Sequence, residues 1–193
     1  MMRVSRLIVL AITLLGLGAC TQPLETFEIS APPLGRSAPG TTRAQLLIPE
    51  PTAIKTIDSD RIVVKPTPYS VEYLADSQWS DRLPRMVQLR LLQAFENTGQ
   101  VGAVGVPGQG LAIDYQIILE IRRFEIDVVN GRQAVIEISV KALNDRNGTV
   151  RRTQIFTGRA PVAGSGNSAF VSALDRAFDQ VSSEIVAWTL ALV

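Results

Sequence analysis

The sequence predicts an α+β domain: a two-layer sandwich with a mainly antiparallel sheet and two amphipathic helices packed on one face. Residues 111–162 alternate apolar and polar side chains and are interrupted by turn signals, which is typical of an antiparallel meander. Residues 83–95 and 170–188 carry apolar side chains at helical spacing instead. Two layers would bury the apolar stripes of both helices against the sheet.

Short strands are predicted before the first helix. Residues 44–48 and 61–65 are rich in branched apolar side chains, and each run is stopped by a pair of prolines, at positions 49 and 51 and at 66 and 68. Residues 26–29 could pair as a further short strand, and residues 104–106 could form another after the first helix.

The first helix is expected to be capped by Ser77 or Ser80, with Pro84 in its first turn, where proline costs little. Asn97 and Gly99 supply its stop. Its apolar face consists of Leu83, Val87, Leu91, Ala94 and Phe95.

The meander should contain an irregularity. Alternation runs cleanly from residue 113 to 121 and then changes phase, which predicts a bulge or sharp bend near Arg122 and Arg123. Asn130-Gly131 predicts a two-residue hairpin, followed by a return strand over residues 134–142. After a turn at Asn147-Gly148, residues 150–159 are more polar and predict a strand at the sheet edge.

The last helix should be capped by Asn167 or Ser168. Its apolar stripe is far more typical of a core-facing helix than of a cofactor site. The stripe consists of Phe170, Leu174, Phe178, Val181, Ile185 and Trp188.

The amino terminus has the features of a secretory signal. Arg3 and Arg6 precede an apolar run of about 12 residues, whose roughly 18 Å of helix is short of the ~30 Å hydrocarbon core. The run ends in Leu17-Gly18-Ala19-Cys20, which resembles the lipobox of bacterial lipoproteins. Cleavage between Ala19 and Cys20, with lipid on Cys20, is therefore expected. The alternative is an ordinary signal peptide with an incidental cysteine.

Three segments follow from these observations. Residues 1–19 are predicted to be the signal peptide, residues 20–42 a lipid-anchored tether rich in proline and glycine, and residues 43–193 one α+β domain. Cys20 is the sole cysteine, so its acylation would leave no disulfide and the domain would depend on packing.

Composition removes several functional classes. The chain has no histidine, which excludes Ser-His-Asp and Cys-His catalysis and the usual zinc sites, and we expect no metal, no cofactor and no enzymatic activity. After loss of Arg3 and Arg6, 17 basic and 18 acidic residues remain, without the basic stripe that nucleic acid requires. Glu125 and Asp127, near the hairpin tip, are expected to form a solvated edge.

Three aromatic residues cluster before the first helix: Tyr69, Tyr73 and Trp79. Two interpretations stay open. The side chains could contact a partner protein or an acyl chain, or they could close the end of the core.

The order of these features resembles a known family. The matching parts are the lipobox, strand 61–65 ending at Pro66, and Tyr73 followed by Trp79-Ser80-Asp81-Arg82-Leu83-Pro84 at the start of the helix; further on come Phe124-Glu125, Leu143-Asn144-Asp145 before Gly148, and the long last helix. Together they resemble the ABC-type transport auxiliary lipoproteins, from about Phe27 to Ala187. Family members often carry Leu-Pro-x-Tyr-Leu after the first strand, whereas this chain has Pro49-Glu50-Pro51-Thr52-Ala53-Ile54, which puts any partner contact through that stretch in question.

The resemblance implies a non-enzymatic lipoprotein of a Gram-negative envelope. It would serve a transporter made of an ATPase, a permease and an MCE-domain substrate-binding protein that moves phospholipid or similar hydrophobic cargo. Thr21, rather than aspartate, follows the cysteine, which by the usual sorting rule favours the periplasmic face of the outer membrane. The resemblance also allows a ring-like homo-oligomer. The alternative is a structural or assembly lipoprotein, such as a pilotin-like or lipopolysaccharide-machinery subunit.

Overall fold

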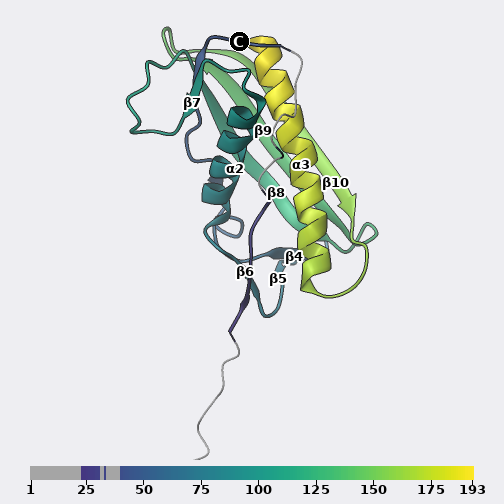
Figure 1. Ribbon diagram of the computed structural model, residues 1–193. Helices are drawn as coiled ribbons and strands as arrows, with labels where there is room; N and C mark the ends of the chain where they lie inside the picture. The colour runs from purple at the N-terminus through teal and green to yellow at the C-terminus, as the bar shows by residue number, and fades with distance from the viewer. Residues whose placement is uncertain (1–22, 31–32, 34–39) are drawn as a thin grey trace, which may run out of the picture.

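The computed structural model describes residues 23–30, 33 and 40–193. Three long strands form its centre: β8 (Tyr115–Asp127), β9 (Gln133–Asn144) and β10 (Thr149–Pro161). They pair in antiparallel fashion in the order β10-β9-β8, so that β10 is an edge strand, as its polarity predicts. Figure 1 shows this sheet behind the two helices.

The change in the alternation of apolar and polar residues within β8 corresponds to an irregularity in the sheet. Its register with β9 shifts between Ile121 and Arg123, as predicted. Ile121 on one side of the shift and Phe124 on the other both face the core and are 1% exposed. One extra residue therefore keeps the apolar side chains on one face along the whole strand.

The other edge of β8 is built from short strands of the amino-terminal half. β2 (Gln45–Leu47), β3 (Thr52–Ala53) and β4 (Val63–Lys65) pair with it in parallel, one after another along its length. β7 (Ala103–Gly105) extends the sheet beyond β2, and β5 (Glu72–Tyr73) pairs with β4 in antiparallel fashion. The long strands thus make the sheet mainly antiparallel, with a parallel margin.

Both helices lie on the same face of the sheet, which confirms the predicted two-layer α+β class (Figure 1). α3 (Asn167–Leu192) crosses β9 and β10, and α2 (Leu83–Thr98) lies beside it. The predicted stripe positions Leu174, Phe178, Val181 and Ile185 are buried, whereas Phe170 and Trp188 are partly buried. Among the described residues, none of the helices has both the length and the hydropathy required to span a bilayer.

The helix ends differ from the prediction at their starts. Gly99 ends α2 in the left-handed conformation, as expected, and Pro84 occupies the first turn. However, Arg82 and Gly166 are the N-cap residues, and neither helix has a capping side-chain hydrogen bond. Instead, the Asn167 side-chain amide donates to the Ala75 carbonyl oxygen at 3.1 Å. This side chain thus joins the start of α3 to the segment between β5 and β6 and does not cap the helix.

The turn between β8 and β9 is longer than the predicted two-residue hairpin. Asp127 pairs with Gln133, which leaves five residues, 128–132, in the turn. Gly131 and Arg132 have positive φ values of 95° and 52°. The left-handed positions thus lie one residue later than an Asn-Gly type I′ turn would place them.

The amino-terminal segment belongs to the fold. β1 (Glu25–Phe27) pairs in parallel with β6 (Ser77–Trp79), and Ile29 is 1% exposed in the core. The Arg90 Nε atom donates to the Ile29 carbonyl oxygen at 2.7 Å, and the Ser30 amide donates to Asp175 at the same distance. Strand pairing and a buried isoleucine thus hold residues 25–30, where the sequence had allowed a short strand over residues 26–29.

Candidate functional site

The predicted lipidation and cleavage residues, Cys20 and Ala19, lie outside the described residues. The three aromatic candidates are described, and the structure separates them. Tyr69 is 97% exposed and Tyr73 37% exposed, but Trp79 is 2% exposed. The two interpretations of this cluster therefore apply to different residues.

Trp79 is a core residue and not a contact residue. Its ring lies edge-on to the Phe124 ring, with centroids 6.0 Å apart and an interplanar angle of 85°. This geometry is a favourable one for aromatic pairs. Of the two interpretations of the aromatic cluster, closure of the core therefore applies to Trp79, and a partner or lipid contact by this side chain does not fit its burial.

Tyr69 lies in the turn between β4 and β5. The Thr67 hydroxyl accepts a hydrogen bond from the Ser70 amide at 3.0 Å and shapes this turn. Tyr73 follows on β5, where the Arg61 guanidinium lies 4.8 Å from the centre of its ring, a cation–π contact. Both tyrosines are thus held at the surface by ordered local structure.

Other exposed apolar side chains gather around them. Val128 and Val129 are 43% and 45% exposed in the turn between β8 and β9, and the Val128 amide donates to the Lys65 carbonyl oxygen at 3.1 Å. We call this surface the apolar end. It consists of Leu24, Tyr69, Val71, Tyr73, Val128 and Val129.

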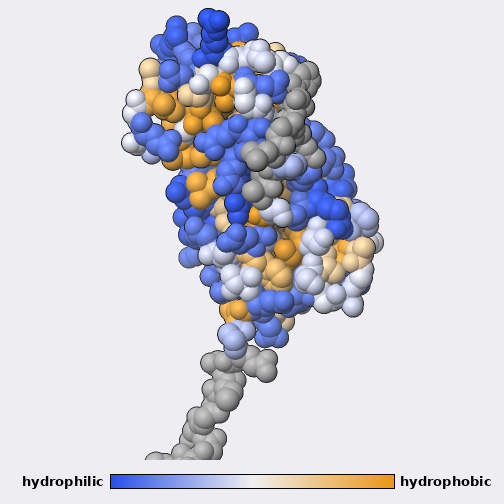
Figure 2. Space-filling model, in the orientation of Figure 1, coloured by the Kyte–Doolittle hydropathy of each residue, from blue (hydrophilic) through white to orange (hydrophobic). Residues whose placement is uncertain are grey.

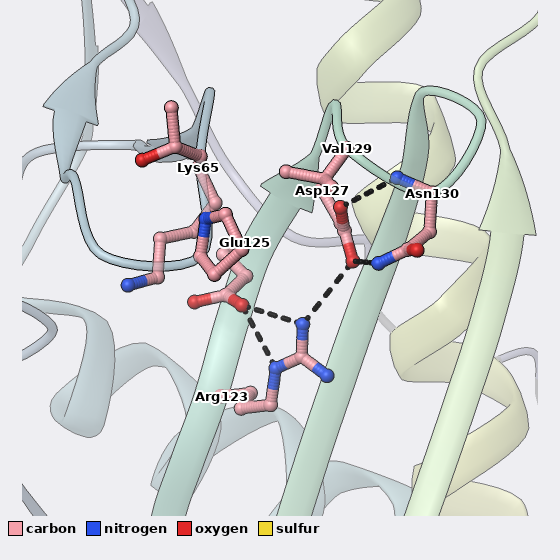
Figure 3. Close-up of a pocket in the computed structure, with 8 residues that line it drawn as sticks. Lys65, Arg123, Glu125, Asp127, Val129 and Asn130 are labelled. Atoms are coloured by element: carbon pink, nitrogen blue, oxygen red, sulfur yellow. Dashed lines mark hydrogen bonds and ion pairs between the residues drawn. The ribbon is translucent and has the colours of Figure 1, made fainter.

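A cluster of charged side chains lies behind the apolar end (Figure 3). Arg123, Glu125 and Asp127 project from one face of β8, on the side of the sheet opposite the helices. The Arg123 Nε atom donates to Glu125 at 2.8 Å, and its Nη2 atom lies 3.4 Å from Asp127. We call these three residues the charged cluster.

The two carboxylates of the charged cluster are buried, which corrects the predicted solvated edge. Glu125 is 4% and Asp127 5% exposed. The turn after β4 folds over them, because Thr67 and Pro68 line the same cavity as the charged cluster. That turn is remote in the sequence, so the alternation of β8 alone gives no sign of this cover.

Asp127 also organises the turn that follows β8. The Asn130 side chain and backbone amide donate to its two carboxylate oxygens at 2.9 and 3.0 Å. The side-chain hydrogen bond from Asn130 lowers the pKa of Asp127 below its ordinary value, aided by backbone amides and the Arg123 charge and opposed by burial. The cluster thus ties β8 to the apolar turn that follows it.

The cavities beside the charged cluster are small. One has a volume of about 250 Å³, and a neighbouring one of about 260 Å³ shares Lys65, Arg123 and Glu125 with it. Pockets for small molecules usually measure ~300–1,000 Å³. Because Arg123 already pairs with both carboxylates, this arrangement is better suited to bracing a surface than to holding a ligand.

Sequence reasoning found Tyr69 and Tyr73 but missed the valines and the charged cluster. The available signal was Val128-Val129, an apolar pair next to the predicted Asn130-Gly131 turn, in a region where polar residues are the rule. Within residues 23–30, 33 and 40–193, no group of three or more potential metal-ligating side chains comes together.

Comparison with known proteins identifies relatives of this chain. An uncharacterized protein of Bradyrhizobium diazoefficiens is 31% identical over 178 residues, which cover 92% of this chain and 48% of the relative. The chain therefore spans about half the length of this curated relative.

Solved structures share the fold. A crystal structure of a Xanthomonas campestris protein superposes with a TM-score of 0.78 and 29% identity, over 86% of this chain and 95% of that one. A PelC dodecamer from Paraburkholderia phytofirmans has a TM-score of 0.50 at 9% identity, over 78% of this chain and 93% of its own, a likeness of fold alone.

The family model described as the ABC-type transport auxiliary lipoprotein component matches residues 27–186. This range begins in β1 and ends within α3, and it agrees with the extent of the resemblance noted in the sequence. The chain therefore belongs to the ABC-type transport auxiliary lipoprotein family.

Proposed function

We propose that this chain is a non-enzymatic lipoprotein that docks the MCE-domain component of an ABC-type transporter at the periplasmic face of the outer membrane. The cargo would be phospholipid or another hydrophobic molecule. The observation that carries the proposal is the family match, which spans nearly all of the described fold.

Sequence features support the anchoring part of this proposal. Cys20 follows a basic start, a short apolar run and Leu17-Gly18-Ala19, and acyl chains on this cysteine would bind the membrane. Thr21 favours sorting to the outer membrane. Replacement Thr21→Asp should retain the lipoprotein in the inner membrane, as measured by density-gradient separation of the two membranes.

The partner is tested by purification from detergent-solubilised membranes, comparing the wild type with Cys20→Ala. Co-purification of an MCE-domain protein with the wild type supports the proposal. Retention of that protein by Cys20→Ala assigns recognition to the folded domain and leaves only placement to the lipid. Recovery of secretion or lipopolysaccharide components without an MCE-domain protein would instead support a structural or assembly lipoprotein.

A further inference from the structure

The described chain begins at one end of the molecule and is held there. The Glu25 amide donates to the Asp76 carbonyl oxygen at 2.8 Å, and the Gln78 amide side chain donates to Thr26 at 3.2 Å. Figure 1 shows this first segment at the lower end, together with β4, β5 and β6. Residues 25–30 therefore have a fixed position relative to the sheet.

This position limits where a lipid on Cys20 can lie. Glu25 lies five positions after Cys20, and an extended chain covers at most ~3.6 Å per position, so the reach is about 18 Å. α3, with 26 residues at 1.5 Å each, is about 39 Å long. A lipid on Cys20 would therefore keep the end of the molecule that carries Glu25, and not the carboxyl-terminal end of α3, close to the membrane surface.

The apolar end occupies this same part of the molecule. The turn carrying Tyr69 and the turn carrying Val129 are neighbours, because Pro68 and Val129 line one cavity. Figure 2 shows hydrophobic residues exposed around the start of the described chain. Of the exposed large hydrophobic side chains among the described residues, those outside the apolar end are Ile54, Val150 and Ile155.

The chemistry of the apolar end fits a lipid interface. Tyrosine has an apolar ring and a polar hydroxyl and is enriched at the headgroup level of membranes. The charges on the segments that carry the apolar end, residues 24–27, 61–76 and 128–132, balance: Arg61, Lys65 and Arg132 are basic, and Glu25, Glu72 and Asp76 are acidic. The contact would therefore depend on apolar burial and not on attraction to anionic lipids.

We propose that the apolar end rests in the membrane interface, with Tyr69 and Val129 among the acyl–headgroup boundary, so that α3 points away from the bilayer. This inference rests on the lipid anchor of the proposed function. Acyl chains on Cys20 keep the protein at the membrane, and the apolar end fixes its orientation there, because two separated contacts define a direction where one does not.

The test uses the full lipidated chain with one added cysteine, labelled with an environment-sensitive fluorophore. Lipidation blocks the Cys20 thiol, so the label goes to the new position. Tyr69→Cys and Val129→Cys are compared with Ile155→Cys, a matched control that is 50% exposed on β10. Each protein is reconstituted into phosphatidylcholine vesicles with and without nitroxide-labelled lipids, and vesicle flotation verifies anchoring.

The expected result is blue-shifted emission and nitroxide quenching at Tyr69→Cys and Val129→Cys, unchanged by salt, with water-like emission at Ile155→Cys. Water-like emission at all three positions in floating protein would overturn the inference and leave the lipid anchor intact. A shift that appears only when an MCE-domain protein is added would overturn it in favour of protein docking. Failure to float would refute the anchor itself, and the inference with it.

Discussion

Two buried carboxylates depend on the Arg123 guanidinium for a compensating positive charge. Glu125 and Asp127 are its partners, with side chains 6% and 8% exposed, while Arg123 itself is 35% exposed. Removing one member of a buried ion pair leaves the other charge without compensation. The energetic importance of Arg123 therefore exceeds that of an ordinary surface arginine.

Arg123→Ala should lower the free energy of unfolding by about 2 kcal/mol. This is less than the ~3–5 kcal/mol of a fully buried pair, since water reaches part of the site. Arg122→Ala is the matched control: Arg122 pairs with the exposed Glu120 at 3.2 Å, and its removal should cost less than about 1 kcal/mol. Urea denaturation of both variants measures the difference, and equal losses would contradict the bracing role.

Asp127 makes the stability of the folded protein depend on pH in the acidic range. Its pKa lies below the ordinary 3.8 in the folded protein, so the unfolded chain takes up the proton first as the pH falls. The contribution of Asp127 is complete well above pH 3.8 and is lost as the pH falls through that value towards the lower folded pKa. Asp127→Asn should reduce stability at pH 7 and flatten its dependence between pH 5 and pH 3.

Urea midpoints measured across this pH range check the prediction. Asn130→Ala should produce part of the same flattening, because it removes the side-chain donor that contributes most to the shift. An unchanged slope in Asp127→Asn would show that other carboxylates account for the acid sensitivity.

At the scale of the elements, β10 and α3 approach each other closely at Gly158. A Cβ atom there would meet the Ala177 carbonyl oxygen and lie 2.8 Å from the Val181 Cγ2 atom. A backbone oxygen of a packed helix cannot give way as the end of a side chain can. Gly158 thus sets the distance between the edge strand and the helix that covers it.

Gly158→Ala should destabilise the protein by about 1–3 kcal/mol, the usual cost of overpacking. Gly105→Ala is the matched control, since its new methyl group would meet the side-chain ends of Gln109 and Leu111 in a loop. We expect Gly105→Ala to reduce the free energy of unfolding by less than Gly158→Ala does. Thermal unfolding of the two variants provides the comparison, and a neutral Gly158→Ala would mean that α3 shifts freely.

Prediction from sequence succeeded for elements whose signal is local. The bulge at Arg122-Arg123, the β10 edge and the Gly99 stop each follow from neighbouring residues. Strands as short as β3 and β5 contain too few alternating residues to predict which strand they pair with. The same limit applies to the candidate site, because burial of Glu125 and Trp79 depends on segments that the chain brings over them from elsewhere.

For the molecule as a whole, the amino-terminal segment is structural. Ile29 lies in the core and its neighbours bond to α2 and α3. Proline and glycine composition indicated a tether over residues 20–42, yet one apolar residue with a place in the core outweighs that composition between residues 25 and 30. With the proposed lipid on Cys20, the domain would be held closer to the membrane than a flexible linker of residues 20–42 would hold it.

Ile29→Ala should cost about 3 kcal/mol of unfolding free energy, within the range for truncating a buried isoleucine. Leu24→Ala, at a side chain that is 44% exposed, should cost less than about 0.5 kcal/mol. Denaturant unfolding of the chain that follows the signal peptide checks both. A negligible effect of Ile29→Ala would restore the tether interpretation for this segment.

The parallel margin of the sheet has a consequence for biosynthesis. β2, β3 and β4 pair with β8, which is translated after all three. A chain exported amino terminus first would expose these segments before their partner arrives, and such long-range pairing forms slowly. The segments that are still unpaired are flanked by prolines, at positions 49, 51, 66 and 68. Proline hinders pairing with other chains. Folding should therefore begin only after residues 115–127 emerge, with the earlier half protected from aggregation by its own prolines.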